Sequence, residues 1–281
     1  MEIGGDWWKD IESVTEEERY LFDAFGYVVV PDVLTEHQVD ALRLTLRQPT
    51  EQFEPVSAEE SPLHWGTAWR DLLDLPKLTP ILEALMGNHE FRDAFIAAKD
   101  REPYPTYRLD HINVHTHVEK GFPGGDLHGG WVNSGGSQYF RYHDGKFYNG
   151  LIAVSFELYD TFENDGGFAC IPGTHKSNLT LPEEWRDLSK GIHPAVKRIA
   201  ARPGDAIVFT EALTHGTLPW EVDAKRQTIF YKFSPHGTTW SADYFNPDDY
   251  RCYEDMDARK LAMLEPPNAR YPGRPTKPEL S

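Results

Sequence analysis

The sequence of 281 residues predicts an all-β core braced by helices, with the strands arranged as a sandwich or jelly roll. Helix patterns are concentrated in the first hundred residues, and short alternating segments with Gly and Pro turns follow. Apolar residues make up 40% of the chain, which is enough for a buried core. We expect a single domain over 1–281, with helices over about 1–100, the strand core over about 105–240 and an extended proline-rich tail over about 264–281.

The N-terminal helices are predicted from their first residues. Thr15 with Glu18, and Thr35 with Gln38, have the spacing of capping boxes, and each pair precedes apolar residues at helical spacing. A third helix is expected with Thr79 as its N-cap. These helices would brace the strands that follow.

The strands are predicted from alternating apolar and polar positions and from the turn residues between them. The clearest alternation puts Ile152, Val154 and Phe156 on one face. The segment 119–150 is rich in glycine and has little apolar periodicity, so we expect a long functional loop or an active-site lid there. The predicted strands are 27–31, 107–118, 151–158, 168–171, 206–210 and 227–234.

Charge and composition exclude several classes of protein. The chain has 45 acidic against 28 basic residues, a net charge of −17, and such a field repels the phosphates of nucleic acids. No apolar run approaches the ~20 residues of a membrane helix, and the N-terminus carries no secretory signal. Cys170 and Cys252 are too few for a disulfide scaffold. We therefore expect a cytoplasmic protein whose partner is a small molecule, not nucleic acid or a membrane.

Two of the twelve histidines stand in positions that suggest a metal site. His128 lies in a glycine-rich segment, and His215 follows a predicted strand. Arg226 comes eleven positions after His215, and an antiparallel hairpin would return it alongside. An imidazole for a metal would then lie beside a guanidinium for a carboxylate.

Four segments in order resemble the phytanoyl-CoA dioxygenase family of iron(II)- and 2-oxoglutarate-dependent oxygenases. The resemblance begins at Phe25-Gly-Tyr-Val-Val-Val-Pro and is most specific over 149–160 and 163–178. The latter segment contains Pro172-Gly-Thr-His-Lys, close to a family signature in which the histidine is structural. The segment from Gly204 to Arg226 matches in order and spacing. The resemblance implies a double-stranded β-helix, a cupin-like jelly roll, in a single catalytic domain.

The resemblance also implies the cofactors and the residues that hold them. Fe(II), 2-oxoglutarate and O₂ would be used, with His128 and His215 as iron ligands. Arg226 would bind the distal carboxylate of 2-oxoglutarate, with a hydrogen bond from the Thr217 hydroxyl. Further contacts would come from the strand around Asp110–Asn113, with Asn113 the candidate, and from Lys146–Tyr148.

The chain departs from the family pattern at one ligand. Where the hydroxylases of the family have an aspartate two residues after the first histidine, this chain has Gly130. Three outcomes are open: a chloride or bromide fills the position, as in halogenase relatives with Ala or Gly there; another acid reaches the iron; or the site binds iron weakly or is inactive. The acids nearest in sequence are Asp126, Asp144 and Glu211.

A straight strand would separate Glu211 from His215 by ~13 Å. Asp126 would have to bind from the opposite side of the first ligand. We therefore rank a halide or water at the open position first and a replacement carboxylate second. Trp131 and Tyr139 are candidates for the wall of a substrate pocket.

The expected activity is functionalisation of an aliphatic C–H bond of a small molecule, with halogenation favoured because Gly130 supplies no carboxylate. The alternatives are a hydroxylase with a replacement carboxylate or water as third ligand, and a silent member that only binds a ligand. A zinc hydrolase built on His111, His115 and His117, which share one strand face, is a further alternative.

Overall fold

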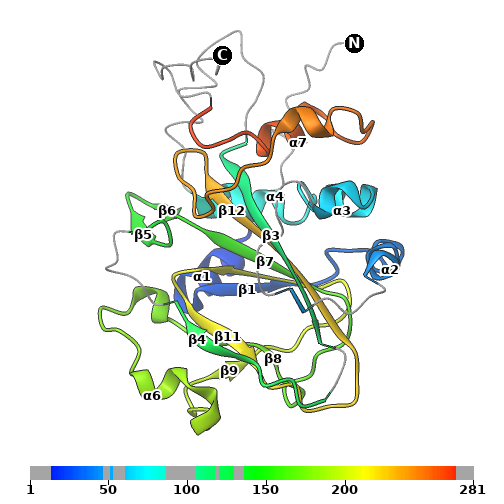
Figure 1. The fold of residues 1–281 in the computed structure, drawn as a ribbon. Helices are drawn as coiled ribbons and strands as arrows, with labels where there is room; N and C mark the ends of the chain where they lie inside the picture. The colour runs from blue at the N-terminus through cyan, green and yellow to red at the C-terminus, as the bar shows by residue number, and fades with distance from the viewer. Residues whose placement is uncertain are drawn as a thin grey trace.

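The computed structural model describes residues 14–46, 51–52, 61–86, 105–117, 120–129 and 136–269. Two antiparallel sheets pack face to face as a double-stranded β-helix, the jelly roll that the sequence predicts (Figure 1). Each of the strands predicted from alternation is present, with ends that differ by one residue at most.

The larger sheet has the strand order β1-β10-β7-β12-β3-β2, and the smaller sheet has the order β4-β11-β8-β9. The larger sheet is formed by β1 (Tyr27–Val30), β2 (Glu51–Gln52), β3 (Tyr107–His117), β7 (Ile152–Glu157), β10 (Ala206–Thr210) and β12 (Arg226–Pro235). The smaller sheet is formed by β4 (Gly125–His128), β8 (Gly167–Ile171), β9 (Lys197–Arg198) and β11 (Thr214–Leu218).

Alternate side chains of β7 point to opposite faces of the large sheet and so belong to two different hydrophobic cores. Ile152, Val154 and Phe156 belong to the core that the large sheet shares with the helices, as predicted. Ala153, on the other face, belongs with Phe168 of the smaller sheet to the core between the two sheets. A cavity lies at this second interface, lined by residues from both sheets, among them His215 of the smaller sheet and Phe230 of the larger.

Most helices lie on the outer side of the large sheet or at one end of the molecule, whereas α6 (Glu183–Arg186) and η3 (Leu188–Lys190) lie against the smaller sheet (Figure 1). The helical elements are α1 (Glu16–Phe25), α2 (Glu36–Thr45), η1 (Pro62–His64), α3 (Thr67–Asp71), α4 (Thr79–Met86), η2 (Thr174–Lys176), α6 (Glu183–Arg186), η3 (Leu188–Lys190), η4 (Pro247–Tyr250) and α7 (Ala258–Met263). Over the described ranges, none of these helices has the length and apolar character needed to cross a membrane.

Both predicted capping boxes are present. Thr15 with Glu18 begins α1, and Thr35 with Gln38 begins α2, each pair with reciprocal side-chain and backbone bonds. Thr79 is the first residue of α4 and not its N-cap, so that prediction is wrong. Its hydroxyl donates to the carbonyl oxygen of Leu75, one turn earlier, because the backbone already turns there.

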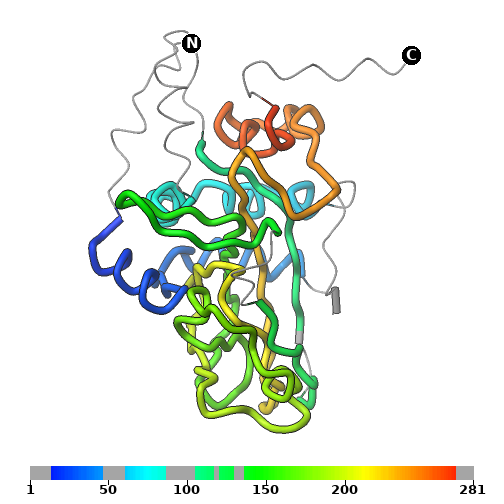
Figure 2. Tube along the Cα trace, turned by 90° about the vertical axis from the view of Figure 1, so that its left-hand side faces the viewer, coloured from blue at the N-terminus to red at the C-terminus, as the bar shows by residue number. Residues whose placement is uncertain are grey.

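The expectation of a long loop over 119–150 is wrong, because this segment holds β4 and a hairpin. Asp144 and Gly145 both have positive φ, 52° and 77°, as a two-residue hairpin turn requires. Phe140 and Phe147 of the hairpin pack on Phe22 of α1, which lies beside it (Figure 2). The hairpin strands are β5 (Phe140–His143) and β6 (Lys146–Asn149).

The first residues of the predicted extended tail, over about 264–281, contact the core. Leu264 is fully buried in the helix-side core, directly after α7. Arg108 of β3 donates from Nε to the carbonyl oxygen of Glu265 at 2.9 Å. These contacts tie the chain to the large sheet through residue 265. The rest of the predicted tail from residue 270 lies outside the described residues.

Candidate metal and cosubstrate site

His128 and His215 lie side by side on neighbouring strands of the smaller sheet. His128 is the last residue of β4 and pairs in register with His215 of β11. Their ring centroids are 4.3 Å apart. The structure therefore brings together the two residues that the sequence names as metal ligands, although 87 positions separate them in the chain.

Glu211 joins this pair from a turn. β10 ends at Thr210 and β11 begins at Thr214, so the chain reverses over the three residues between them. Oε2 of Glu211 lies 3.8 Å from Nε2 of His215, and one ligand atom from each of His128, Glu211 and His215 lies within 4.8 Å of the others. The expected separation of ~13 Å is wrong because it assumed that the strand continues past Thr210.

The turn that carries Glu211 packs against the backbone at Gly129. The φ of Gly129 is +93°, a conformation that favours glycine, and a Cβ there would overlap the carbonyl oxygen of Leu213. The carbonyl oxygen of Glu211 would also be only 3.1 Å from that Cβ. The glycine after His128 thus permits the close approach that brings the Glu211 turn beside the histidines.

The hydrogen bonds of the two histidines fix which nitrogen faces a metal. Nδ1 of His215 lies 2.7 Å from the carbonyl oxygen of Leu213, and Nδ1 of His128 lies 3.0 Å from that of Asp126. A carbonyl oxygen only accepts, so each Nδ1 donates its proton. Nε2 of each ring therefore carries the lone pair, which is the form in which imidazole binds a metal.

The charges at the site suit a divalent metal. Burial raises the pKa of Glu211, but Lys232, whose Nζ is 2.9 Å from Oε1, and the nearby histidines together lower it to about 2. Burial and the neighbouring His128 lower the pKa of His215 to about 3. At neutral pH Glu211 is ionised and His215 is neutral, which are the forms that ligate.

A cavity of about 290 Å³ opens between the two sheets at the histidines. Asn113 of β3 and Thr217 of β11, both predicted to contact 2-oxoglutarate, line it. Oδ1 of Asn113 is buried and has no hydrogen-bond partner among the described residues. The lining residues are Asn113, His115, Gly125, Asp126, His128, Phe168, Phe209, His215, Gly216, Thr217, Phe230 and Lys232.

Arg226 is fully buried and is not among the residues that line this cavity; it lies near Gly167, which precedes the lining residue Phe168. Its Nη2 donates to Oε1 of Glu157 at 3.2 Å, whereas Nε and Nη1 have no partner among the described residues. A Cβ on Gly167 would lie 3.0 Å from Nε, so the glycine leaves space beside the guanidinium. The expected hairpin between His215 and Arg226 is wrong, because β11 and β12 belong to different sheets.

The remaining predicted residues lie in several places. Asp126 is exposed on β4 and lines the cavity, but its carboxylate is not in the metal-ligand group. Asp144 is exposed in the β5–β6 turn beside His143 and does not line the cavity. The ring of Tyr139 lies under Arg141, with 4.8 Å from its centroid to Cζ, and does not line the cavity either. Gly130 and Trp131 lie outside the described residues.

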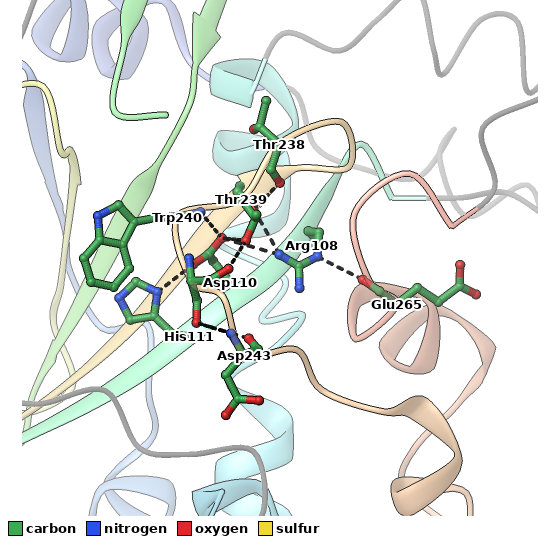
Figure 3. Close-up of polar contacts among 10 residues, drawn as sticks. Arg108, Asp110, His111, Thr238, Thr239, Trp240, Asp243 and Glu265 are labelled. Carbon is green, nitrogen blue, oxygen red and sulfur yellow. Dashed lines mark hydrogen bonds and ion pairs between the residues drawn. The ribbon is translucent and has the colours of Figure 1, made fainter. Parts of the chain in front are cut away.

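Asp110 of β3 is committed to a structural network and is not available to a ligand (Figure 3). Its Oδ1 accepts from His111 Nδ1 at 2.7 Å, and Oδ2 accepts from the Trp240 backbone N at 2.9 Å and from Thr239 Oγ1 at 3.0 Å. Burial raises the pKa of Asp110, but these bonds, with His111 the strongest, lower it to about 2. The network anchors the loop after β12 and places the ring of Trp240 against that of His111, with centroids 4.7 Å apart and planes tilted by 32°.

The comparison with known proteins decides the family. The family model of phytanoyl-CoA dioxygenase (PhyH) matches residues 22–228, most of the chain. The chain belongs to the phytanoyl-CoA dioxygenase family. No curated protein sequence matches it.

Solved structures with the same fold agree with this assignment. HygX from Streptomyces hygroscopicus, in a structure with nickel and 2-oxoglutarate bound, aligns with a TM-score of 0.63 and 24% identity over 82% of this chain and 90% of that chain. HygX with iron bound aligns with a TM-score of 0.60 and 22% identity over 82% and 90%. AviO1 from Streptomyces viridochromogenes Tue57 aligns with a TM-score of 0.50 and 16% identity over 82% and 100%.

As a member of this family, the chain is an oxygenase of the iron(II)- and 2-oxoglutarate-dependent class. The residues present fit both iron(II) and 2-oxoglutarate. The Nε2 lone pairs of the two histidines and the carboxylate of Glu211 suit iron(II). Nε and Nη1 of buried Arg226, which have no partner among the described residues, suit a carboxylate of 2-oxoglutarate. Sequence reasoning missed Lys232 and Glu157, the charged partners of Glu211 and Arg226. Alternation along β12 was a usable signal for Lys232, because it shares a strand face with Phe230, which also lines the cavity.

Proposed function

We propose that this protein is an iron(II)- and 2-oxoglutarate-dependent oxygenase that hydroxylates an aliphatic C–H bond of a small molecule, with His128, Glu211 and His215 as its iron ligands. The observation that carries the proposal is the position of Glu211, whose Oε2 lies 3.8 Å from Nε2 of His215. Two imidazoles and one carboxylate on one side of an iron ion leave open positions for a cosubstrate and O₂. Iron(II) with 2-oxoglutarate, when bound, would supply the means to activate O₂, which is the oxidant both of an unactivated C–H bond and of 2-oxoglutarate, giving succinate and CO₂.

The protein's own part in this reaction is to hold the reactants in a dry, ordered site. Arg226 offers Nε and Nη1 to the distal carboxylate of 2-oxoglutarate, while Nη2 stays on Glu157. Thr217 and Asn113 add polar contacts from the cavity wall. The aromatic residues of the lining exclude water from the reacting carbon; they are Phe168, Phe209 and Phe230.

Hydroxylation is preferred over halogenation because of charge. The prediction of halogenation rested on Gly130 and on Glu211 being out of reach. With Glu211 in the ligand group, the protein itself provides the negative charge that a halide would otherwise add to two neutral imidazoles. A halide at the iron would then have to compete with an ionised, buried carboxylate.

A small molecule fits the size of the site as substrate. A cavity of about 290 Å³ is at the lower end of the range for ligand pockets, so 2-oxoglutarate and the reacting end of the substrate would fill it. The HygX structure with nickel, 2-oxoglutarate and hygromycin B bound supports a small molecule as the partner of this fold.

The test is an anaerobic titration with Fe(II) followed by 2-oxoglutarate, monitored by absorption with and without chloride. We expect the wild type to develop an absorption band on addition of both, unchanged by chloride, and to convert 2-oxoglutarate to succinate when O₂ is admitted. Glu211→Ala should weaken iron binding by more than ~10-fold, because it removes a ligand, whereas Asp126→Asn should bind iron as the wild type does.

Two results would contradict the proposal. A chloride-dependent spectrum together with unchanged iron affinity in Glu211→Ala would favour halogenation. Absence of O₂-dependent succinate formation in iron-loaded protein would favour a silent binding protein.

A further inference from the structure

Lys232 contacts one oxygen of the Glu211 carboxylate, and His215 lies near the other. Nζ of Lys232 lies 2.9 Å from Oε1 of Glu211, whereas Oε2 lies 3.8 Å from Nε2 of His215. Both residues of the ion pair are shielded: the side chain of Glu211 is 3% exposed and that of Lys232 is 18% exposed. A single carboxylate is thus shared between a lysine and the metal-ligand group.

The fold holds Lys232 firmly in this position. It lies on β12 between β3 and β7, paired in register with His111 on one side and Ala153 on the other. Its side chain is part of the cavity wall. Because a buried carboxylate without a partner is costly, the ion pair fixes Glu211 in the orientation observed.

We propose that Lys232 is a positioning residue that restricts Glu211 to one oxygen toward the metal and so keeps a coordination position free for 2-oxoglutarate. The inference rests on the proposed function, in which Glu211 is an iron ligand. Two histidines and one carboxylate oxygen leave half of the positions of an octahedral ion open. A carboxylate that bound through both oxygens would occupy one of these three positions. 2-Oxoglutarate needs two of them, for its carboxylate and its keto oxygen, so it would be confined to the one remaining pair, would compete with Glu211 for any other pair, and would leave no position for O₂.

Two other roles for Lys232 make different predictions. A lysine that contacts 2-oxoglutarate directly would strengthen its binding whether or not Glu211 is present. A lysine that only contributes a positive field would act in the same way, and any other cation at its position would replace it fully. Only a lysine that acts through Glu211 loses its effect when Glu211 is removed.

The test is a double-mutant cycle with Co(II) as the metal. Lys232→Met and Lys232→Arg are prepared in the wild type and in Glu211→Ala, and the dissociation constants of Co(II), and of 2-oxoglutarate for the Co(II)-saturated protein, are measured by calorimetry. We expect Lys232→Met to bind Co(II) at least as tightly as the wild type but to bind 2-oxoglutarate ~10–100-fold more weakly. Lys232→Arg, which keeps a donor on Oε1, should restore most of that affinity.

The variants that also carry Glu211→Ala show whether Lys232 acts through Glu211. There, Lys232→Met should change 2-oxoglutarate affinity by less than ~3-fold, since the cycle isolates the coupling between the two side chains. The Co(II) absorption bands provide a second readout, because a change in coordination number alters their intensity. Lys232→Met should show altered bands before 2-oxoglutarate is added, and Lys232→Arg should not.

Lys232→Ala is a second variant in case Lys232→Met does not fold, because it leaves room for water beside Glu211. Added propylamine should restore its 2-oxoglutarate affinity. An equal loss of affinity with and without Glu211, or unchanged affinity in the lysine variants, would overturn the inference and leave the proposed function intact. Wild-type Co(II) affinity in Glu211→Ala would overturn both, because Glu211 would then not be a ligand.

Discussion

Glu211 and His215 are four positions apart in the chain, yet Oε2 of the first lies 3.8 Å from Nε2 of the second. A turn of three residues between β10 and β11 makes this approach possible. It supplies a carboxylate to two histidines in a chain that has glycine at the position where hydroxylases of the family have their aspartate. In the proposed iron site, Glu211 in the β10–β11 turn takes the place of that aspartate as the carboxylate ligand.

Replacement of Arg226 should separate cosubstrate binding from metal binding. Arg226→Met removes the two unpartnered donors and leaves Glu157 buried without its ion partner. We expect 2-oxoglutarate to bind more weakly by ~2–4 kcal/mol, with Co(II) affinity unchanged, in calorimetric titrations. Arg251→Met, at an exposed arginine, is the control and should change neither constant. Unchanged 2-oxoglutarate affinity in Arg226→Met would refute the assignment.

Glu157 should act on 2-oxoglutarate through Arg226. Its carboxylate accepts from Arg226 Nη2 at 3.2 Å, Ser155 Oγ at 3.0 Å and Thr228 Oγ1 at 2.9 Å, so it holds the guanidinium with its other edge free. Glu157→Gln keeps the shape but weakens the charge-assisted bond, and should reduce 2-oxoglutarate affinity by ~1–2 kcal/mol in the same titration. A loss of Co(II) affinity as large as that of 2-oxoglutarate would instead indicate general unfolding of the site.

Gly129→Ala should disturb the metal site more than its backbone strain alone explains. The new Cβ would overlap the carbonyl oxygen of Leu213 in the Glu211 turn. Gly145→Ala is a matched control, because Gly145 also has a positive φ but nothing within 4 Å of a Cβ. We expect Gly145→Ala to lower the free energy of unfolding by ~1–2 kcal/mol with metal affinity intact. Gly129→Ala should lower it further and also weaken Co(II) binding. Equal effects of the two variants would show that the contact with Leu213 is unimportant.

Asp110 should make stability depend on acid pH. Its folded pKa of about 2 is below the unfolded value of about 3.9, so the folded state binds the proton less readily. The stabilisation is complete above about pH 4 and is lost as the pH falls toward 2; its size is ~2–3 kcal/mol. The difference in free energy of unfolding between wild type and Asp110→Asn, measured by urea denaturation, should shrink over that interval. The exposed Asp248→Asn serves as control, and a pH-independent difference for Asp110→Asn would contradict the account.

The sequence predicts most of the fold, because alternation in the strands and the capping boxes at Thr15 and Thr35 are local signals with few competing interpretations. The β5–β6 hairpin was missed even though Asp144-Gly145 is a strong turn signal, since the surrounding glycines and weak periodicity favoured a loop. The hairpin proposed between His215 and Arg226 was wrong because spacing along the chain does not reveal which sheet a strand joins.

The candidate site was predictable only in part. His128 and His215 followed from the family resemblance, and the structure pairs them in register. Glu211 was placed too far away because no Gly or Pro marks the end of β10. The turn begins instead with the Thr210 hydroxyl, which accepts from the Ala212 backbone N at 3.3 Å, a weaker sequence signal. The partnership of Glu211 with Lys232 depends on two strands of one sheet and has no local signature.

The central claim is that Glu211 completes the iron site. A crystal structure of the anaerobic Fe(II) and 2-oxoglutarate complex, grown with millimolar chloride, tests it most directly. The account predicts a Glu211 carboxylate oxygen at ~2.0–2.2 Å from the metal and no halide on it. A density peak at ~2.3–2.5 Å from the iron, with Glu211 in contact with Lys232 alone, would contradict the account and support a halide ligand. That distance is taken from the ~2.3 Å of a metal–sulfur bond, because a halide is similar in size to sulfur.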